Sequence, residues 1–348
     1  MGWSERQDIK MRIASMHGAL NSGSGSKRSS GLPRQKPGPN TVRALPLYCT
    51  SHQSADAMNY RHAFHAGNFA DVLKHAVLFA LIEALKAKPA PFCFVDTHAG
   101  SGCYALDSTQ AGKTGEYKDG IARLLFPDMH GDGSSPALPT LLQRWLQTIL
   151  DLPGNEDGLK LYPGSPLQVA QAMRANDSAQ LCELHPEEAT RLRDLFHRDT
   201  RVHVHQRDGY EALKGFVPPQ EKRGLVLIDP PFEAQEDEYR TIEKAIKNAL
   251  LRWPGGVYAV WYPIKRRSQV QPFHRWLQHS GVKRVLRAEL LVRPDDSPLR
   301  LNGSGMVILN APWKLDDALR EPMQALGRLL SQDRPAQTRL DWLVEETP

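Results

Sequence analysis

The sequence lacks the features that would commit it to a membrane, to disulfides or to zinc. Its four cysteines, Cys49, Cys93, Cys103 and Cys182, have no CxxC spacing and are too sparse for a disulfide scaffold, so we expect reduced thiols. No run of about 18 apolar residues occurs, and the N-terminus has no apolar block of the kind found in secretory signals. These absences predict a cytoplasmic protein with no membrane partner.

Most of the chain also lacks an excess of basic residues. The net charge of +5 comes from 44 Lys and Arg against 39 Asp and Glu, and eight of the former against three of the latter fall in residues 1–57. Residues 58–348 therefore hold 36 of each sign, which is 44 less 8 and 39 less 3. Any argument for nucleic-acid binding has to come from local patches.

Residues 1–57 have little apolar periodicity and are rich in Gly, Ser, Pro and basic residues, as in the stretch NSGSGSKRSSGLPRQKPGP. Such a composition cannot bury enough surface to fold. We predict a disordered extension without a catalytic role, and an ordered domain that begins at residue 58.

The pattern of apolar residues in that domain predicts an α/β fold. Spacings of three and four from Asp71 to Lys86 indicate a helix that starts near Gly67-Asn68. Phe92–Val95 is a short run suited to a strand buried on both faces, and it ends at Asp96. Similar runs in GLVLIDPP, GVYAVWYP, RVLRAELLV and GMVILNAPW alternate with helical stretches such as 237–251 and 271–278. This alternation is typical of a mostly parallel sheet. Residues 104–163, with the amphipathic stretch ALPTLLQRWLQTIL, predict a helical insertion beside the sheet.

The segment GLVLIDPPF carries the most chemistry. It places Asp229 directly after a predicted buried strand, at the edge where open α/β sheets bind ligands. An Asp-Pro-Pro-aromatic sequence is typical of enzymes that methylate adenine N6, a conjugated amine and a poor nucleophile. Asp229 and the Pro230 carbonyl can accept its N–H protons as positive charge develops, and Phe232 offers a ring face for the base, so we predict these three to be catalytic. The alternative is an ordinary strand end with a stray acid. The similar NAPW at 310–313 lacks the first proline, and we expect a structural turn there.

Other acids follow other predicted strands. The turn DTHAGSG begins at Asp96, and its glycines, among them Gly100, allow close backbone approach to a ligand. Glu183 ends the next apolar run and Asp208 follows a third. In nucleotide-binding sheets an acid after the second strand commonly binds ribose hydroxyls. Each carboxylate alone could be a surface group, but in this order the four acids, including Asp229, predict one shared crevice.

The stretch NYRHAFHAGNFADVLKHAV, residues 59–77, holds three histidines and an aspartate. Its spacing contains no HExxH pattern and no cysteine, so we predict no metal site. Polar residues at a helix start are the remaining simple interpretation.

With these residues together, the chain resembles the bacterial 23S ribosomal RNA adenine-N6 methyltransferases of the large-subunit methyltransferase J family. The motifs YRHAFHAGNFADVLKH, DTHAGSG, TGEY, YPGSP, ELHP, RDGY, LIDPPF, WYP and GSGM stand in the family's order over nearly all of 58–348. Two positions depart from the family pattern: Phe232 replaces a tyrosine, and Ala311 replaces a proline in the later turn.

The resemblance implies a Rossmann-like methyltransferase domain over 58–348 with an inserted helical subdomain at 104–163. It implies S-adenosyl-L-methionine as cofactor and 23S ribosomal RNA as partner. Separately, we expect a monomer. The implied cofactor contacts are His75, His98, Ser165, Glu183, Asp208, Gly209 and Asp229. The implied substrate contacts are Tyr60, His62 and Lys74, with residues 58–70 as a flap that closes on cofactor and base.

Two alternatives stay open at this point: a DNA adenine-N6 methyltransferase, because the DPPF chemistry does not depend on the sugar, and a noncatalytic RNA-binding assembly factor with the same fold. The stretch IKRRSQVQPFHRW, with Lys265, Arg266, Arg267 and Arg275, is the favoured phosphate-contacting segment. A solvated helix face is the other interpretation of these charges.

Overall fold

The computed structural model describes residues 62–126, 137–233, 235–295, 297–298, 301–332 and 335–345. The predicted extension 1–57 and the predicted substrate contact Tyr60 lie outside this described part.

A sheet of eight strands runs through the molecule, with the strand order β10-β8-β9-β7-β6-β1-β4-β5. Its strands are β1 Cys93–Asp96, β4 Ser178–Cys182, β5 Val202–His205, β6 Gly224–Ile228, β7 Val257–Ile264, β8 Val285–Leu291, β9 Gly303–Leu309 and β10 Gln337–Val344. The strands β5, β4, β1, β6 and β7 pair in parallel, whereas β9, β8 and β10 add by antiparallel pairing. The chain leaves β1 toward β4 and β5 and returns on the other side with β6, so a topological switch point lies between β1 and β6.

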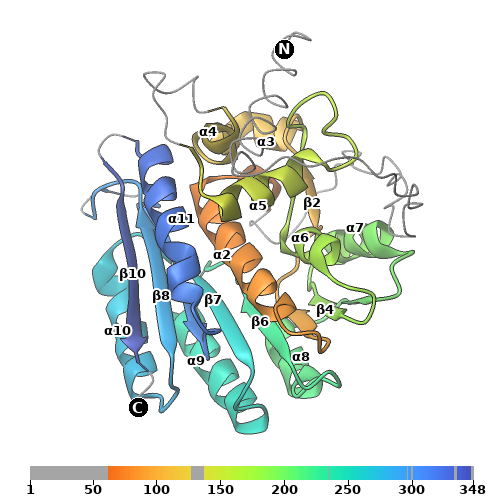
Figure 1. Cartoon of the computed structure of the whole chain (residues 1–348), viewed down its shortest axis with the longest axis vertical. Coiled ribbons are helices and arrows are strands. Elements are labelled where there is room, and N and C mark those ends of the chain that lie inside the picture. Colours follow the sequence, from red (N-terminus) through yellow and green to blue (C-terminus); the bar gives the residue numbers. More distant parts are fainter. Residues whose placement is uncertain are drawn as a thin grey trace, which may run out of the picture.

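Helices cover both faces of this sheet (Figure 1). One face packs against α2 Phe69–Lys86, α6 Ser165–Ala172, α7 Pro186–Phe196 and α11 Leu315–Leu329. The other face packs against α8 Gly209–Phe216, α9 Gln235–Arg252 and α10 Arg267–His279. Successive residues of a strand point to opposite faces, so Val226 and Ile228 join the second core while Leu225 and Leu227 join the first. Every residue of β1 and β6 is buried, as their continuous apolar runs predict. The α/β Rossmann-like class is confirmed.

The segment between β1 and β4 contains the short pieces that the sequence predicted as an insertion. They are β2 Cys103–Ala105, α3 Thr109–Thr114, η2 Glu116–Asp119, α4 Ile121–Leu125, α5 Thr140–Leu150 and β3 Leu161–Pro163. β2 and β3 form their own antiparallel pair, which brings the two ends of the segment together. The amphipathic α5 buries Leu142, Trp145, Leu146 and Ile149.

Two predicted details were close to the observed elements. Helix α2 begins at Phe69, with the Asn68 side chain accepting hydrogen bonds from the Ala70 and Asp71 N–H groups as its N-cap. The NAPW turn at 310–313 follows β9, which runs antiparallel to β7 and therefore ends at the opposite edge of the sheet from Asp229. There Asn310 Nδ2 donates to the carbonyls of Pro254 and Gly256, which fits a structural turn.

Among the helices in the described ranges, none combines the length and the apolar content needed to cross a bilayer.

Candidate active site

Four acids follow four neighbouring parallel strands. Asp96 ends β1, Glu183 follows β4, Asp208 lies after β5, and Asp229 follows β6. Because β5, β4, β1 and β6 are adjacent and parallel, these carboxylates share one edge of the sheet, at its switch point. The structure thus places these four carboxylates at one edge of the sheet, as their order in the sequence predicted.

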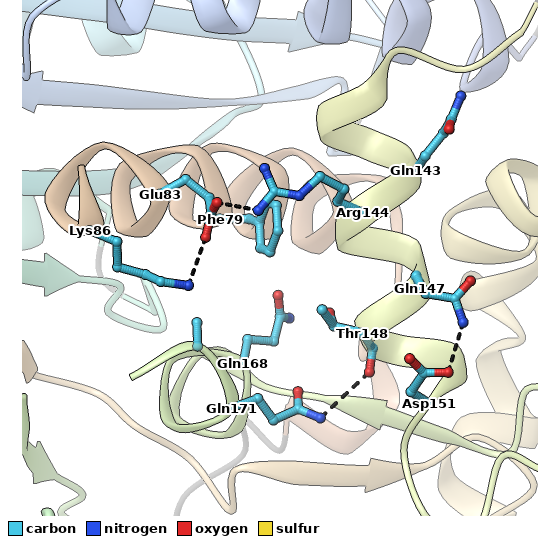
Figure 2. A pocket seen from close by; sticks show the side chains of 11 residues that line it. Phe79, Glu83, Lys86, Gln143, Arg144, Gln147, Thr148, Asp151, Gln168 and Gln171 are labelled. Carbon is cyan, nitrogen blue, oxygen red and sulfur yellow. Dashed lines mark hydrogen bonds and ion pairs between the residues drawn. The ribbon is translucent and has the colours of Figure 1, made fainter. Parts of the chain in front are cut away.

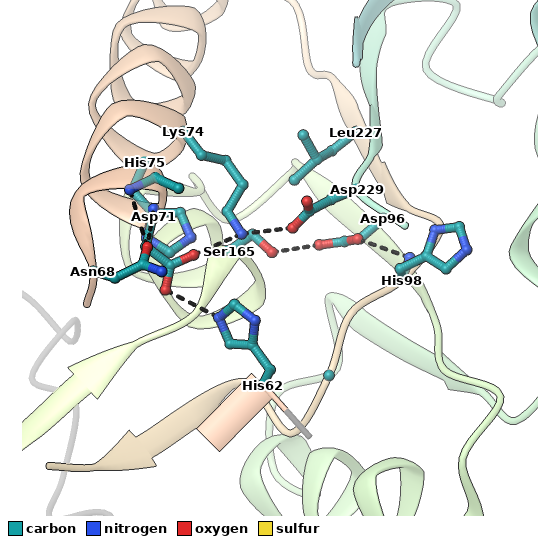
Figure 3. Close-up of polar contacts among 12 residues, drawn as sticks. His62, Asn68, Asp71, Lys74, His75, Asp96, His98, Ser165, Leu227 and Asp229 are labelled. Carbon is teal, nitrogen blue, oxygen red and sulfur yellow. Dashed lines mark hydrogen bonds and ion pairs between the residues drawn. The ribbon is translucent and has the colours of Figure 1, made fainter. Parts of the chain in front are cut away.

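Lys74 joins the strand edge to helix α2 (Figure 3). Its Nζ lies 2.5 Å from Asp229 Oδ2 and 2.8 Å from Asp71 Oδ1, one turn earlier on the same helix. Asp71 Oδ2 in turn lies 3.0 Å from His62 Nε2 and accepts the N–H of Gly67. A continuous polar chain therefore runs from His62 through Asp71 and Lys74 to Asp229.

Within this polar chain of side chains, attraction between opposite charges outweighs the cost of burial and so determines which groups are charged. Burial lowers the pKa of Lys74, but the carboxylates of Asp229 and Asp71 outweigh it and raise that pKa above its ordinary value. Burial raises the pKa of Asp71, but His62 and Lys74 outweigh it and hold that pKa well below its ordinary range. Lys74 is therefore an ammonium group and Asp71 a carboxylate at neutral pH.

Asp96 is fully buried beside this chain. Its Oδ2 accepts the Ser165 hydroxyl at 2.7 Å, and its Oδ1 accepts the backbone N–H of His98 at 3.1 Å. Burial, reinforced by the nearby Asp229 carboxylate, raises the pKa of Asp96 to about 7. A buried carboxyl that is half protonated near neutral pH and lies near a second acid is typical of a functional site.

His98 is held as a neutral ring with a defined tautomer. The Thr97 hydroxyl donates to the Leu227 carbonyl and lies 2.8 Å from His98 Nδ1, so Nδ1 carries the proton and donates to Thr97. Burial lowers the pKa of His98 to about 4. Its ring packs edge-on against Tyr210 at 5.0 Å between centroids, and Nε2 is left as an acceptor.

Glu183 is oriented by two backbone donors. Its Oε2 accepts the N–H of Gly100 at 2.8 Å, and its Oε1 accepts the N–H of His185 at 2.7 Å. Gly100 has φ +61°, and a Cβ there would lie 2.2 Å from the Tyr104 hydroxyl, so the turn requires glycine. Burial raises the pKa of Glu183. The carboxylate keeps one lone pair per oxygen for outside donors.

Asp208 and Gly209 place the start of helix α8 against the end of β1. Asp208 Oδ1 accepts the N–H of Glu211 at 2.9 Å and so caps the helix. A Cβ on Gly209 would lie 2.0 Å from the Thr97 carbonyl oxygen, so only glycine permits this approach.

His75 lies on α2, one residue after Lys74, and is 1% exposed. Its Nδ1 lies 2.7 Å from the Tyr162 hydroxyl, while its Nε2 has no hydrogen-bond partner in the described part of the chain. Burial lowers the pKa of His75 well below its ordinary value, so the ring is neutral. A buried ring nitrogen without a partner is a place where a ligand group could bind.

Phe232 is buried in this conformation. Its ring is 5% exposed and contacts the rings of Tyr239 and Trp261, with centroids 5.2 and 5.7 Å away. Its φ of +50° is unfavourable for a residue with a side chain, at a cost of roughly 1–2 kcal/mol. Stacking of a base on Phe232 therefore requires the strained turn after the buried Pro230 to rearrange.

The insertion holds the segment that precedes α2. Glu116 Oε2 lies 3.0 Å from both His65 Nδ1 and Asn68 Nδ2. The hydrogen bond to Glu116 raises the pKa of His65. Ile121 N–H donates to the Gly67 carbonyl. Residues 62–68 are thus packed between α2 and the insertion.

Sequence reasoning missed Asp71, Glu116 and Trp261. Asp71 could have been found as the acid three residues before Lys74 on one helix face. Trp261 lies at the centre of β7, with its ring centroid 6.0 Å from Lys74 Nζ. Glu116 is 51 residues from His65, so only the folded chain reveals this contact.

A second hollow, of about 280 Å³, lies between α2, α5 and α6 (Figure 2). Glu83 pairs there with Lys86 and Arg144, Asp151 accepts a hydrogen bond from Gln147, and Gln168 uses both ends of its amide in hydrogen bonds. It adjoins the C-terminal half of α2, whereas Lys74 lies in the N-terminal half. It therefore offers no unpaired group for chemistry.

Within the residues that the structure describes, no group of three or more His, Cys, Asp or Glu side chains is arranged to hold a metal ion.

Most of the chain matches proteins of one family. The family described as "Ribosomal RNA large subunit methyltransferase D, RlmJ" has a sequence model that matches residues 89–344. The "Ribosomal RNA large subunit methyltransferase J" of Escherichia coli (strain K12) is 40% identical over 290 residues, which cover 83% of this chain and 100% of the relative. The protein of the same name from Haemophilus influenzae is 40% identical over 289 residues, with the same coverage of 83% and 100%.

A solved structure agrees with these sequence matches. The crystal structure of a Legionella pneumophila protein superposes with a TM-score of 0.71 at 34% identity, over 80% of this chain and 98% of that one. At this level of similarity the fold is shared along nearly the full length of that protein.

Proposed function

The chain belongs to the RlmJ family of large-subunit ribosomal RNA methyltransferases, and from this premise we propose that the carboxylate edge around Asp229 is its active site. The protein is an enzyme that uses S-adenosylmethionine to methylate N6 of an adenine in 23S ribosomal RNA. The observation that carries the site assignment is the convergence of Asp96, Glu183 and Asp229 on one edge, joined to helix α2 by Lys74.

The residues at this edge fit the cofactor's chemistry. The backbone-oriented carboxylate of Glu183 keeps acceptor sites that suit ribose hydroxyls. The unpartnered Nε2 of buried His75 and the acceptor Nε2 of His98 offer further polar contacts. Ser165, Asp208 and Gly209 complete the proposed cofactor residues. When bound, S-adenosylmethionine supplies an electrophilic methyl group on a sulfonium.

Asp229 has the position of the group that accepts the amine's N–H. Its Oδ2 is held by Lys74, while its Oδ1 takes no hydrogen bond from any described residue and can bind the adenine N6–H. The Pro230 carbonyl accepts the second N–H. As the amine gains positive charge, these oxygens stabilise it and Asp229 takes up the proton. Lys74 and His62 fix Asp229 from the helix side, and Tyr60 completes the proposed substrate contacts.

The target adenine has to leave any helix before it can reach Asp229. A base inside an RNA duplex presents only its edges, so the amine can meet a carboxylate at the sheet edge only when the nucleotide is unpaired or turned outward. We infer a monomeric, cytoplasmic enzyme whose catalytic domain spans 58–348, with 104–163 as the insertion.

Replacing Asp229 tests the proposal. We expect Asp229→Ala to reduce kcat of methyl transfer to 23S rRNA by roughly 10²-fold or more, the scale of lost charge stabilisation, without weakening RNA binding. Mass-spectrometric mapping of methylated adenines in rRNA from cells that carry only this variant should show the target unmodified.

The matched control is Asp237→Ala, which removes an exposed acid at the start of α9, where it pairs only loosely with Arg240 at 3.6 Å. It should leave kcat unchanged. Turnover of Asp229→Ala within threefold of the parent would remove Asp229 from the mechanism.

A further inference from the structure

Strand β7 extends past the active site. Ile228, the last residue of β6, pairs with Val260, and β7 continues to Ile264. Asp229 is therefore level with Trp261, four residues before Lys265. At about 3.3 Å per residue, Lys265 lies roughly 13 Å further along, at the same edge of the sheet as Asp229. Lys265 and Arg266 are exposed, and in the described part of the chain neither forms an ion pair.

The backbone under these two side chains is fixed. Asn302, which is fully buried, donates from Nδ2 to the Lys265 carbonyl at 2.7 Å, and its own N–H donates to the Ile264 carbonyl. Asp295 Oδ1 accepts the N–H of Arg267 at 2.7 Å and caps helix α10. The cations are therefore presented by a rigid support, which reduces the entropy lost when they bind.

Further basic groups stand behind them. Arg267 follows Arg266, and Arg293 begins the loop after β8, whose end lies at the same edge because β8 and β7 are both antiparallel to β9. We name Lys265, Arg266, Arg267 and Arg293 the basic ledge. Asp295 is the acid that adjoins it among the described residues. The ledge therefore carries a surplus of positive charge, unlike residues 58–348 as a whole, which hold 36 charged residues of each sign.

The order of the strands in the sheet determines whether the cofactor or the RNA can reach the basic ledge. Of the proposed cofactor groups, His98, Glu183 and Asp208 follow β1, β4 and β5, on one side of β6, whereas β7 and β8 lie on the other side. When the cofactor occupies that side and the adenine lies at Asp229, the ends of β7 and β8 are the part of the sheet edge left for the polynucleotide that carries the adenine.

We propose that the basic ledge binds phosphates of the RNA strand flanking the target adenine, and so sets the affinity and register of the substrate. This inference rests on the proposed function and adds a contact surface to it. Lysine and arginine contacts with phosphates position a nucleic acid without reading its bases. The ledge should therefore act on substrate binding and its salt dependence, and leave the methyl-transfer step unaltered.

The test is the double variant Lys265→Ala/Arg266→Ala, with a protein-free 23S rRNA transcript as substrate. Each phosphate contact to single-stranded RNA contributes about 0.7 to the slope of log K against log salt, or about fivefold in affinity at 0.1 M salt. We expect the KM for RNA to rise about 25-fold at that salt concentration and the slope to fall by about 1.4. The kcat value and cofactor affinity measured by calorimetry should stay within twofold.

Two control variants accompany the test. The first removes two positive charges elsewhere, and the second removes none. Lys244→Ala/Lys247→Ala takes two exposed lysines from α9, far from the edge, and should change KM less than twofold. Lys265→Arg/Arg266→Lys keeps both charges and should retain most of the affinity. A ledge variant with unchanged KM and salt slope, or a loss matched by the α9 control, would overturn the inference. Since Asp229 acts on kcat, that outcome would leave the proposed function standing.

Discussion

Two clusters of charged side chains, most of them buried, lie in the two halves of the sheet, and they are paired differently. In the structural cluster, between β7, β8, β10 and α10, Arg287 donates to both oxygens of Asp341 and to His274 Nδ1. His274 Nε2 then meets the Tyr262 hydroxyl, which donates to Glu289. In the site cluster, Asp71, Asp96 and Asp229 surround one lysine.

The difference shows where the molecule uses polar groups for stability and where for chemistry. Burial lowers the pKa of His274 to about 3, so the ring is neutral, and its two nitrogens are matched to one donor and one acceptor. The site cluster has surplus carboxylate and, at His75 Nε2, an unpartnered buried nitrogen. A cluster that is incomplete by itself is one that ligands can complete.

The largest effect should come from breaking the structural cluster. Arg287 is 6% exposed, so Arg287→Met leaves Glu289 and Asp341 without their buried cation. We expect a loss of about 4 kcal/mol in the free energy of unfolding, measured by chemical denaturation, because removal of one partner strands a buried charge. The folded fraction should keep its kcat, since the cluster lies outside the crevice.

Arg339→Met is the matched control, because Arg339 binds the same Asp341 Oδ2 at 3.0 Å with a side chain that is 48% exposed. Its loss should cost less than about 1 kcal/mol. Equal losses for the two arginines would mean that burial does not distinguish them.

The next effect concerns the site cluster. Lys74→Met removes the cation that holds Asp229 and leaves two carboxylates facing each other. We expect kcat to fall about 10²-fold, because the proton acceptor loses its orientation. Lys86→Met, on the same helix with a partly exposed side chain paired to Glu83, should leave kcat unchanged. Steady-state methyl transfer measures both, and a Lys74 variant with near-normal kcat would place Lys74 among the structural residues.

The sequence predicted the strands and the acids at their ends better than it predicted which side chains pair. Apolar runs report burial, so strands β1 and β6 and the acids at their ends could be located. Helix α10 was predicted to start at Gln271, beside Pro272, yet it begins at Arg267. The reason is a cap from Asp295, 28 residues further along the chain, which periodicity does not register.

Side-chain partners were the less predictable part of the site. Lys74 and Asp229 are 155 residues apart, and nothing in either local pattern says that they meet. Phe232 was predicted to face the base from its place in DPPF, but its positive φ turns the ring into the core beside Trp261. Sequence periodicity fixes which face a residue occupies, whereas the turn conformation fixes where its side chain points.

The smallest expected effect is a gain in the free energy of unfolding, opposite in sign to the loss expected for Arg287→Met. Asp96 has a folded-state pKa of about 7, above its unfolded value, so the wild-type protein takes up a proton on folding and loses stability as pH rises through that range. Asp96→Asn removes this cost and keeps an acceptor for the His98 N–H. Relative to wild type, the variant should gain about 2 to 3 kcal/mol between pH 5 and pH 8 in the free energy of unfolding, without cofactor.

Asp177→Asn separates this effect from the burial of an aspartate in general. Asp177 is also buried, but it binds Arg174, and although burial raises its pKa, the hydrogen bonds from Arg174 hold that pKa below its ordinary value. Its carboxylate is ionised in both folded and unfolded chains above pH 5, so its replacement should destabilise the protein by the same amount at pH 5 and pH 8. A pH-independent difference for Asp96→Asn as well would show that the strand-edge carboxyl is as well satisfied as a structural one, and the contrast between the two clusters would then rest on geometry alone.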